Sequence, residues 1–171
     1  DINIIEVEKA HPKFHARHDA KLRSYIYQIA CRRTAFGKPF VWWIKDDLNV
    51  SKMSKAAQLF IGMHDFISFA DKDGDEKSTK VLLKNVEIKK EGDLIISRIS
   101  GFHFLWKMVR RMVGVLAEIG RGNMKESDIT YFLEHNSPTP AQYTAPPSGL
   151  FLENVFYDES RQPKELEQII R

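Results

Sequence analysis

The amino-acid sequence predicts an α+β fold with a mostly antiparallel sheet flanked by helices. Segments in which apolar and polar residues alternate, typical of half-buried strands, are mixed along the chain with segments whose apolar residues recur every three or four positions, typical of helices. Two neighbouring strand segments, 81–89 and 94–99, are joined by a Glu-Gly-Asp turn and predict a hairpin, in which strands are antiparallel. The sequence lacks the glycine-rich phosphate loops of doubly wound nucleotide-binding folds.

The first third of the chain is expected to hold two strands and a turn. Residues 2–7 are rich in isoleucine and valine and read as a strand. Residues 21–33 are the clearest strand, because apolar residues such as Tyr25 and Tyr27 are interleaved with polar ones and β-forming residues are dense. Glycine and proline in the segment 34–39 indicate a turn.

The middle of the chain is expected to begin with a helix over about 50–61. Asn49 can cap the first turn of this helix, and Gly62 lies at its expected C′ position. Residues 71–80, around Gly74, are polar and are expected to form the loop that leads into the hairpin.

Residues 103–120 form the strongest predicted helix, which Gly120 and Gly122 can end. The apolar residues at three- and four-residue spacing are Leu105, Met108, Val109, Met112, Val113, Leu116 and Ile119. Arg110 falls at the border of this apolar face. From there its guanidinium can either extend to solvent or point into a site and pair with a carboxylate or phosphate.

The last part of the chain is expected to hold a helix over about 126–135, a loop over 136–149 and a final strand over 150–157. The sequence beyond this strand is acidic and is expected to form at most a loose helix. We therefore interpret residues 1–157 as one folded unit and residues 158–171 as an acidic C-terminal tail.

Positive charge is concentrated in two segments of the chain. The net charge of the 171 residues is +3, but residues 13–33 and 98–125 each carry six basic residues and one acidic residue. Residues 126–171 are acidic. If the two basic segments meet in space, they form a face suited to a polyanion. The alternative is two solvated faces that do not meet.

Cysteine and hydropathy limit where such a protein functions. The single cysteine, Cys31, excludes an internal disulfide bond and fits a reducing compartment, so we expect an intracellular protein of the cytoplasm, or of the nucleus or mitochondrion in a eukaryote. No apolar run is long enough for a transmembrane helix, and no membrane partner is expected.

No metal site is expected. Pro12 interrupts any helix that would gather His11, His15 and His18, and no cysteine or carboxylate completes a ligand set there. The acidic loop 71–80 lacks the spacing of glycine and glutamate that a calcium loop requires.

Basic and aromatic residues share one face of the strand predicted over 21–33. Arg23, Tyr25 and Tyr27 fall on the same side because side chains alternate along a strand. Such a face suits RNA, since phosphate binds guanidinium and an unpaired base stacks on an aromatic ring. Ordinary packing between neighbouring strands is the alternative.

Four blocks of the sequence, in order, resemble the TruA family of tRNA pseudouridine synthases. They are FHARHDAKLRSYIY at 14–27, GMHDFISF at 62–69, FLWKMVRRMVG at 104–114 and APPSGLFLENVFY at 145–157. Together they cover about residues 1–157. The resemblance implies a partial pseudouridine synthase fold that isomerises uridine to pseudouridine in the anticodon stem-loop of tRNA, without a cofactor. It also implies a homodimer.

The resemblance implies roles for individual residues. Arg110 would pair with the catalytic aspartate and keep it ionised, Tyr25 would lie against the uracil, and Leu150 would line the pocket. The residues implied to contact RNA phosphates are Arg17, Arg23, Lys107, Arg111 and Arg121.

One departure from the family pattern matters for activity. The catalytic aspartate of the family lies in an R-T-D-x-G-V-H-A motif upstream of the first block, and this sequence does not contain that motif. Asp19, Asp65 and Asp71 stand in other contexts of the family. We therefore expect the C-terminal part of a catalytic region, inactive alone. A non-catalytic RNA-binding module and a protein-interaction domain remain the alternatives.

Overall fold

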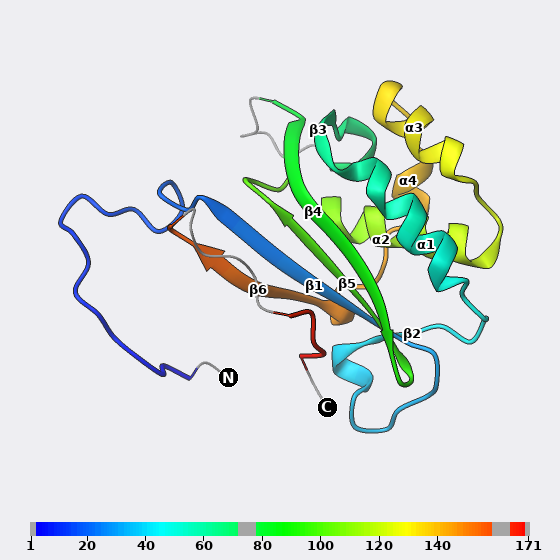
Figure 1. The fold of residues 1–171 in the computed structure, drawn as a ribbon, viewed down its shortest axis with the longest axis horizontal. Coiled ribbons are helices and arrows are strands. Elements are labelled where there is room, and N and C mark those ends of the chain that lie inside the picture. Colours follow the sequence, from blue (N-terminus) through cyan, green and yellow to red (C-terminus); the bar gives the residue numbers. More distant parts are fainter. Residues whose placement is uncertain (1–2, 72–77, 159–164, 170–171) are drawn as a thin grey trace.

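The structure has two layers, an open sheet of six strands and a set of helices packed on one of its faces (Figure 1). It is a computed structural model that describes residues 3–71, 78–158 and 165–169. All strand pairs but one are antiparallel. The predicted α+β class with a mostly antiparallel sheet is therefore confirmed.

The strand β1 (Leu22–Ala30) organises the sheet. The other strands are β2 (Trp42–Trp43), β3 (Gly62–Asp65), β4 (Lys80–Glu91), β5 (Leu94–Gly101) and β6 (Leu150–Phe156). Their order is β2-β1-β5-β4-β3. Strand β5 follows one edge of β1, while β6 and the short parallel strand β2 share the opposite edge. The predicted hairpin is confirmed as β4 and β5, with Gly92 at a φ of +57° in its turn.

The helices are α1 (Val50–Ala57), α2 (Met108–Arg121), α3 (Glu126–Glu134) and the single turn α4 (Thr139–Gln142). The predicted cap of α1 is confirmed, because the Asn49 side chain accepts a hydrogen bond of 2.9 Å from the backbone amide of Lys52. Gly122 ends α2 in the left-handed conformation. Every apolar residue predicted to form the buried face of this helix is buried.

The core lies between α1, α2 and the sheet. Side chains of β1 that face the helices, such as Tyr27 and Ile29, pack with Met112 and Val113 of α2 and with a cluster of phenylalanines near β3. Gly114 allows the closest approach, since a Cβ atom there would lie 1.6 Å from the carbonyl oxygen of Tyr143. A side chain at this position would force α2 away from the segment that precedes β6.

Several predicted boundaries are wrong for local reasons. The helix predicted over 103–120 begins only at Met108, because Lys107 has a φ of +63° that an α-helix does not accept. The helix predicted over 50–61 changes to a 3-10 turn at Gln58. Gly62 begins β3 rather than capping that helix.

The two ends of the chain also differ from the prediction. Residues 3–7 form no strand, and Ile4, Ile5 and Val7 are exposed, because no described segment pairs with them. Residues 165–169 form no helix. The rest of the tail predicted as a loose helix, and the glycine-centred part of the loop predicted over 71–80, lie outside the described residues.

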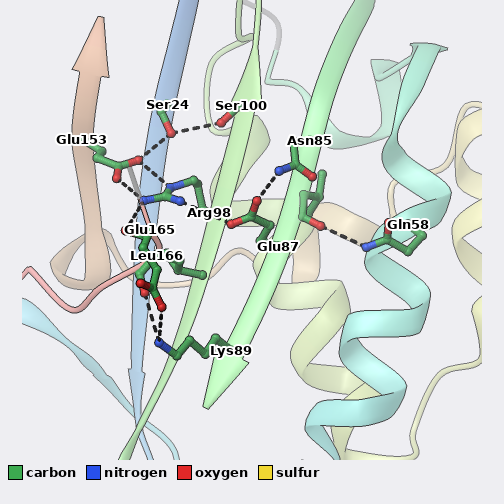
Figure 2. Close-up of polar contacts among 11 residues, drawn as sticks. Ser24, Gln58, Asn85, Glu87, Lys89, Arg98, Ser100, Glu153, Glu165 and Leu166 are labelled. Carbon is green, nitrogen blue, oxygen red and sulfur yellow. Dashed lines mark hydrogen bonds and ion pairs between the residues drawn. The ribbon is translucent and has the colours of Figure 1, made fainter. Parts of the chain in front are cut away.

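The second face of the sheet carries a buried ionic network (Figure 2). Arg98 of β5, with 3% of its side chain exposed, forms paired hydrogen bonds of 2.9 and 2.5 Å with the carboxylate of Glu153 on β6. It also contacts Glu87 of β4 at 3.3 Å and the backbone oxygen of Glu165 at 3.2 Å. Leu166 packs beside this network and is buried. The network thus joins three strands and holds part of the C-terminal tail on the sheet.

Breaking this network should destabilise the fold. We expect Glu153→Gln to lower the free energy of unfolding by about 3 kcal/mol, because it leaves a buried guanidinium without its main carboxylate. Chemical denaturation measures the change. The matched control is Asp93→Asn, which breaks the exposed Arg32–Asp93 pair of 2.7 Å and should cost no more than about 1 kcal/mol. Equal losses in the two variants would contradict this account.

Candidate active site

A cavity of about 460 Å³ opens beside the N-terminal end of α2, between this helix, β1 and the start of β6. Its volume suits a small organic group such as a nucleotide. It is lined by Arg17, Tyr25, Phe104, Leu105, Trp106, Lys107, Met108, Val109, Arg110, Pro147 and Leu150. Of these described lining residues, three are cationic and none is acidic. The structure thus brings together five of the eight predicted site residues.

Tyr25 reaches this cavity from the middle of β1. Its backbone lies between Ile99 of β5 and Leu152 of β6, so the strand is fixed on both edges. Its ring packs edge-to-face on Phe104, with 4.8 Å between the ring centroids. Within the described part of the chain, its hydroxyl group makes no hydrogen bond. The ring is therefore held in place while the hydroxyl stays available to a ligand.

Arg110 reaches the cavity from the first turn of α2. Its Nε donates a hydrogen bond of 2.6 Å to the carbonyl oxygen of Ala145, and the amide of Ala145 donates one of 3.1 Å to the carbonyl oxygen of Arg110. The two terminal nitrogens of the guanidinium pair with none of the described residues. One edge of the group is thus anchored, and the other can bind a carboxylate or a phosphate through two parallel hydrogen bonds.

Tyr27 does not face a ligand. It supports the backbone segment that carries Ala145. It is fully buried, and its hydroxyl group donates a hydrogen bond of 2.6 Å to the carbonyl oxygen of Pro146. Burial raises the pKa of this phenol well above its usual value, against the opposing effect of the Arg110 charge. Tyr27 therefore stays a neutral donor. Of the two tyrosines predicted to share a binding face, only Tyr25 is open to a ligand.

Lys107 lies at the cavity mouth, immediately before α2. Its Nζ lies 2.5 Å from the carboxylate of Asp71, which also contacts Arg111 at 3.3 Å. The hydrogen bond from Lys107 is the main reason that the pKa of Asp71 lies below its usual value. Two cations share one carboxylate, so this group of three residues keeps a net positive charge.

The remaining predicted RNA contacts lie outside the cavity. Arg23 donates hydrogen bonds of 2.5 Å to the carbonyl oxygens of Phe102 and Arg17, and thereby ties the segment before β1 to the end of β5. Arg111 is buried and donates to the carbonyl oxygen of Ala70. Arg121, at the far end of α2, pairs with Asp46 at 2.7 Å. Roles of these three in RNA binding stay predictions.

Sequence reasoning missed the residues that support the site. Nothing in the pattern indicates that Asp71 reaches Lys107, because the two are far apart in the sequence and meet only through the turn after β3. Phe104 and Trp106 fall inside the helix predicted over 103–120, so the sequence does not indicate that they line a cavity. The helix instead begins after Lys107, which departs from helical geometry, and both rings line the cavity.

The part of the chain that the structure describes holds neither a metal-binding cluster nor a helix that could span a membrane. No group of three or more histidine, cysteine, aspartate or glutamate residues is placed to hold a metal ion there. Among the same residues, no helix combines the length and the apolar character needed to cross a membrane.

The fold and the cavity define an α+β protein with a cavity lined by cationic and aromatic side chains. The sequence model of a family described as tRNA pseudouridine synthase matches residues 56–158, more than half of the chain. The chain belongs to this family, as its sequence blocks predicted.

Curated relatives agree with this assignment. A protein of Clostridium botulinum (strain Eklund 17B / Type B) named tRNA pseudouridine synthase A is 38% identical over 92% of this chain and 65% of its own length. One of the same name from Pseudothermotoga lettingae is 39% identical over 89% of this chain and 63% of its own. A Bacillus anthracis protein named tRNA pseudouridine synthase A 2 is 35% identical over 91% and 64%. The chain thus spans somewhat less than two thirds of these relatives.

The support that Tyr27 gives to the cavity wall can be tested on its own. We expect Tyr27→Phe to lower the free energy of unfolding by about 1–2 kcal/mol, because the carbonyl group of Pro146 loses its buried donor. Thermal or chemical unfolding measures this. Tyr131→Phe, at a tyrosine that is 53% exposed, is the control and should change stability by less than about 0.5 kcal/mol. If the two variants are equally stable, the hydrogen bond to Pro146 contributes nothing.

Proposed function

We propose that residues 1–157 are the C-terminal part of the catalytic region of a tRNA pseudouridine synthase that acts on uridine in the anticodon stem-loop. The observation that carries this proposal is the half-anchored guanidinium of Arg110, which lines a cavity whose described lining residues include no acid. The two terminal nitrogens of this guanidinium, unpaired among the described residues, suit a carboxylate or an RNA phosphate in the cavity better than a neutral ligand.

The reaction assigns a task to each group in the cavity. In uridine the N1–C1′ bond breaks, the uracil turns, and a C5–C1′ bond forms, while C5 loses a proton and N1 gains one. Bonds and electrons balance without a cofactor. A carboxylate supplies the nucleophilic or basic function, and Arg110 holds it ionised and oriented. The Tyr25 ring lies against the uracil, and Leu150 lines the pocket.

The carboxylate itself is proposed to come from a part of the protein beyond these residues. Among the residues that the structure describes, no acidic side chain lines the cavity, and the chain spans less than two thirds of its relatives. The aspartate motif of the family would supply it. On this proposal the 171 residues bind tRNA alone but turn it over only together with that motif.

The basic cavity supports tRNA as the proposed partner. Taking a uridine out of an RNA stem-loop costs unstacking energy, which contacts between cations and phosphates offset. Arg17 and Lys107 line the cavity and are the residues proposed to make such contacts. A homodimer is also proposed, on the resemblance alone, and sedimentation of the full-length protein tests it.

Tritium release from tRNA labelled at uridine C5 tests the enzyme proposal directly. We expect release with the full-length chain and none with the 171 residues alone. In the full-length chain, Arg110→Ala should lower turnover by roughly 10²–10³-fold, the range seen when one electrostatic partner of a reacting group is removed. Arg110→Lys should not restore it, because an ammonium group lacks the planar fork.

The control is Lys55→Ala, which removes an exposed cation on α1 that pairs with Glu126 at 3.1 Å and should leave turnover unchanged. Near-normal turnover in Arg110→Ala would overturn the role given to Arg110.

If the full-length chain releases no tritium but binds tRNA with a salt dependence of about 0.7–0.9 log units per phosphate contact, the RNA-binding module is correct instead. Binding that does not change with salt favours a protein-interaction domain.

A further inference from the structure

The turn between β5 and α2 presents an exposed tryptophan to the cavity mouth, and the proposed reaction does not use it. Trp106 lines the cavity while 59% of its surface stays open to solvent. Within the described residues, no aromatic ring or cation packs against its indole. The other exposed tryptophan, Trp43, differs in this respect, because the guanidinium of Arg33 lies 4.4 Å from its ring centroid.

The backbone on both sides of Trp106 is fixed. The Trp106 carbonyl oxygen accepts a hydrogen bond of 3.0 Å from the amide of Asp71, and the amide of Met108 donates one of 3.2 Å to Leu105. Lys107 is the only residue other than glycine with a positive φ in the described part of the chain. Such a left-handed conformation is unfavourable for a residue that carries a side chain. It persists where surrounding contacts impose it, which happens preferentially at ligand sites.

Asp71 supplies most of these contacts. Besides its backbone hydrogen bond to Trp106, its carboxylate holds the ammonium group of Lys107. The Lys107 side chain remains 35% exposed, so that its other donors can reach a ligand. One residue thus holds the backbone that carries an exposed aromatic ring and pairs with the cation next to it.

We propose that Trp106 and Lys107 form a second nucleotide subsite at the mouth of the cavity. The indole stacks on the base next to the reacting uridine, the ammonium group binds the adjoining phosphate, and Asp71 positions both. This inference rests on the proposed function. A uridine that leaves its stack exposes the faces of its neighbours, and an aromatic platform replaces the lost stacking.

Substitutions at Trp106 in the full-length chain test the platform. We expect Trp106→Ala to weaken tRNA binding at least tenfold, a fold-change typical for loss of one base-stacking ring. Trp106→Phe should recover most of that loss, because a smaller ring still offers a face. Trp43→Ala is the matched control and should change affinity by less than twofold. If Trp106→Ala binds tRNA as the unaltered chain does, the proposal fails.

A second measurement identifies the base. The unaltered chain and Trp106→Ala are compared on tRNAs with an abasic site immediately 5′ or immediately 3′ of the reacting uridine. At one of these positions, the unaltered chain should bind the abasic tRNA about tenfold more weakly than the intact tRNA. At the same position, the abasic site should weaken binding by Trp106→Ala no more than twofold. Equal losses by both proteins at both positions would show that the indole does not stack there.

Asp71 calls for a separate readout, because it is a positioning residue. Asp71→Asn keeps the backbone hydrogen bond but releases Lys107, so KM for tRNA should rise several-fold while the single-turnover rate at saturation is unchanged. Asp71→Glu should restore part of the loss. A fall in the saturated rate with unchanged KM would overturn the assignment. Tritium release by the unaltered chain is measured in parallel. It distinguishes failure of the subsite proposal from failure of the enzyme proposal.

Discussion

The reciprocal hydrogen bonds between Arg110 and Ala145 are the interaction on which the site depends. They tie the first turn of α2 to the segment before β6, and they can form only because Gly114 lets the helix approach the backbone at Tyr143. The same contact anchors one edge of the guanidinium and leaves the other edge open. The contact between α2 and the segment before β6 therefore packs the core and also orients the Arg110 guanidinium for binding.

The two faces of the sheet are stabilised in different ways. The face toward the helices is apolar, and it supplies most of the area removed from water. On the opposite face, the described residues form a small apolar cluster around Ile26 and Ile96 and the buried Arg98–Glu153 pair. An ion pair of this kind contributes little net stability compared with apolar packing, but it penalises any misaligned pairing of β5 with its neighbours. It thus fixes the alignment of β5 and β6, the two strands that flank β1 and its Tyr25.

Features set by local sequence were predictable, and features set by distant contacts were not. The alternation of β1, the turn at Gly92 and the cap at Asn49 follow from nearby residues and were predicted correctly. The start of α2 was predicted wrongly, because the apolar spacing of residues 103–107 suits a helix while Asp71 holds Lys107 in another conformation. Alternation placed Tyr25 and Tyr27 on one face, but only the position of β6 and its preceding segment decides which of them meets a ligand.

The pairing of β1 with β6 sets the order in which the protein is built. Residues 22–27 at one end of the folded unit pair with residues 150–156 at the other. During synthesis, β1 leaves the ribosome long before β6, the strand that completes its outer edge. Until β6 is made, this edge of β1 stays open and the cavity is incomplete. The hairpin of β4 and β5 and the helices can form from neighbouring sequence, whereas closure of this long loop comes late. The ligand site is consequently among the last parts of the molecule to take shape.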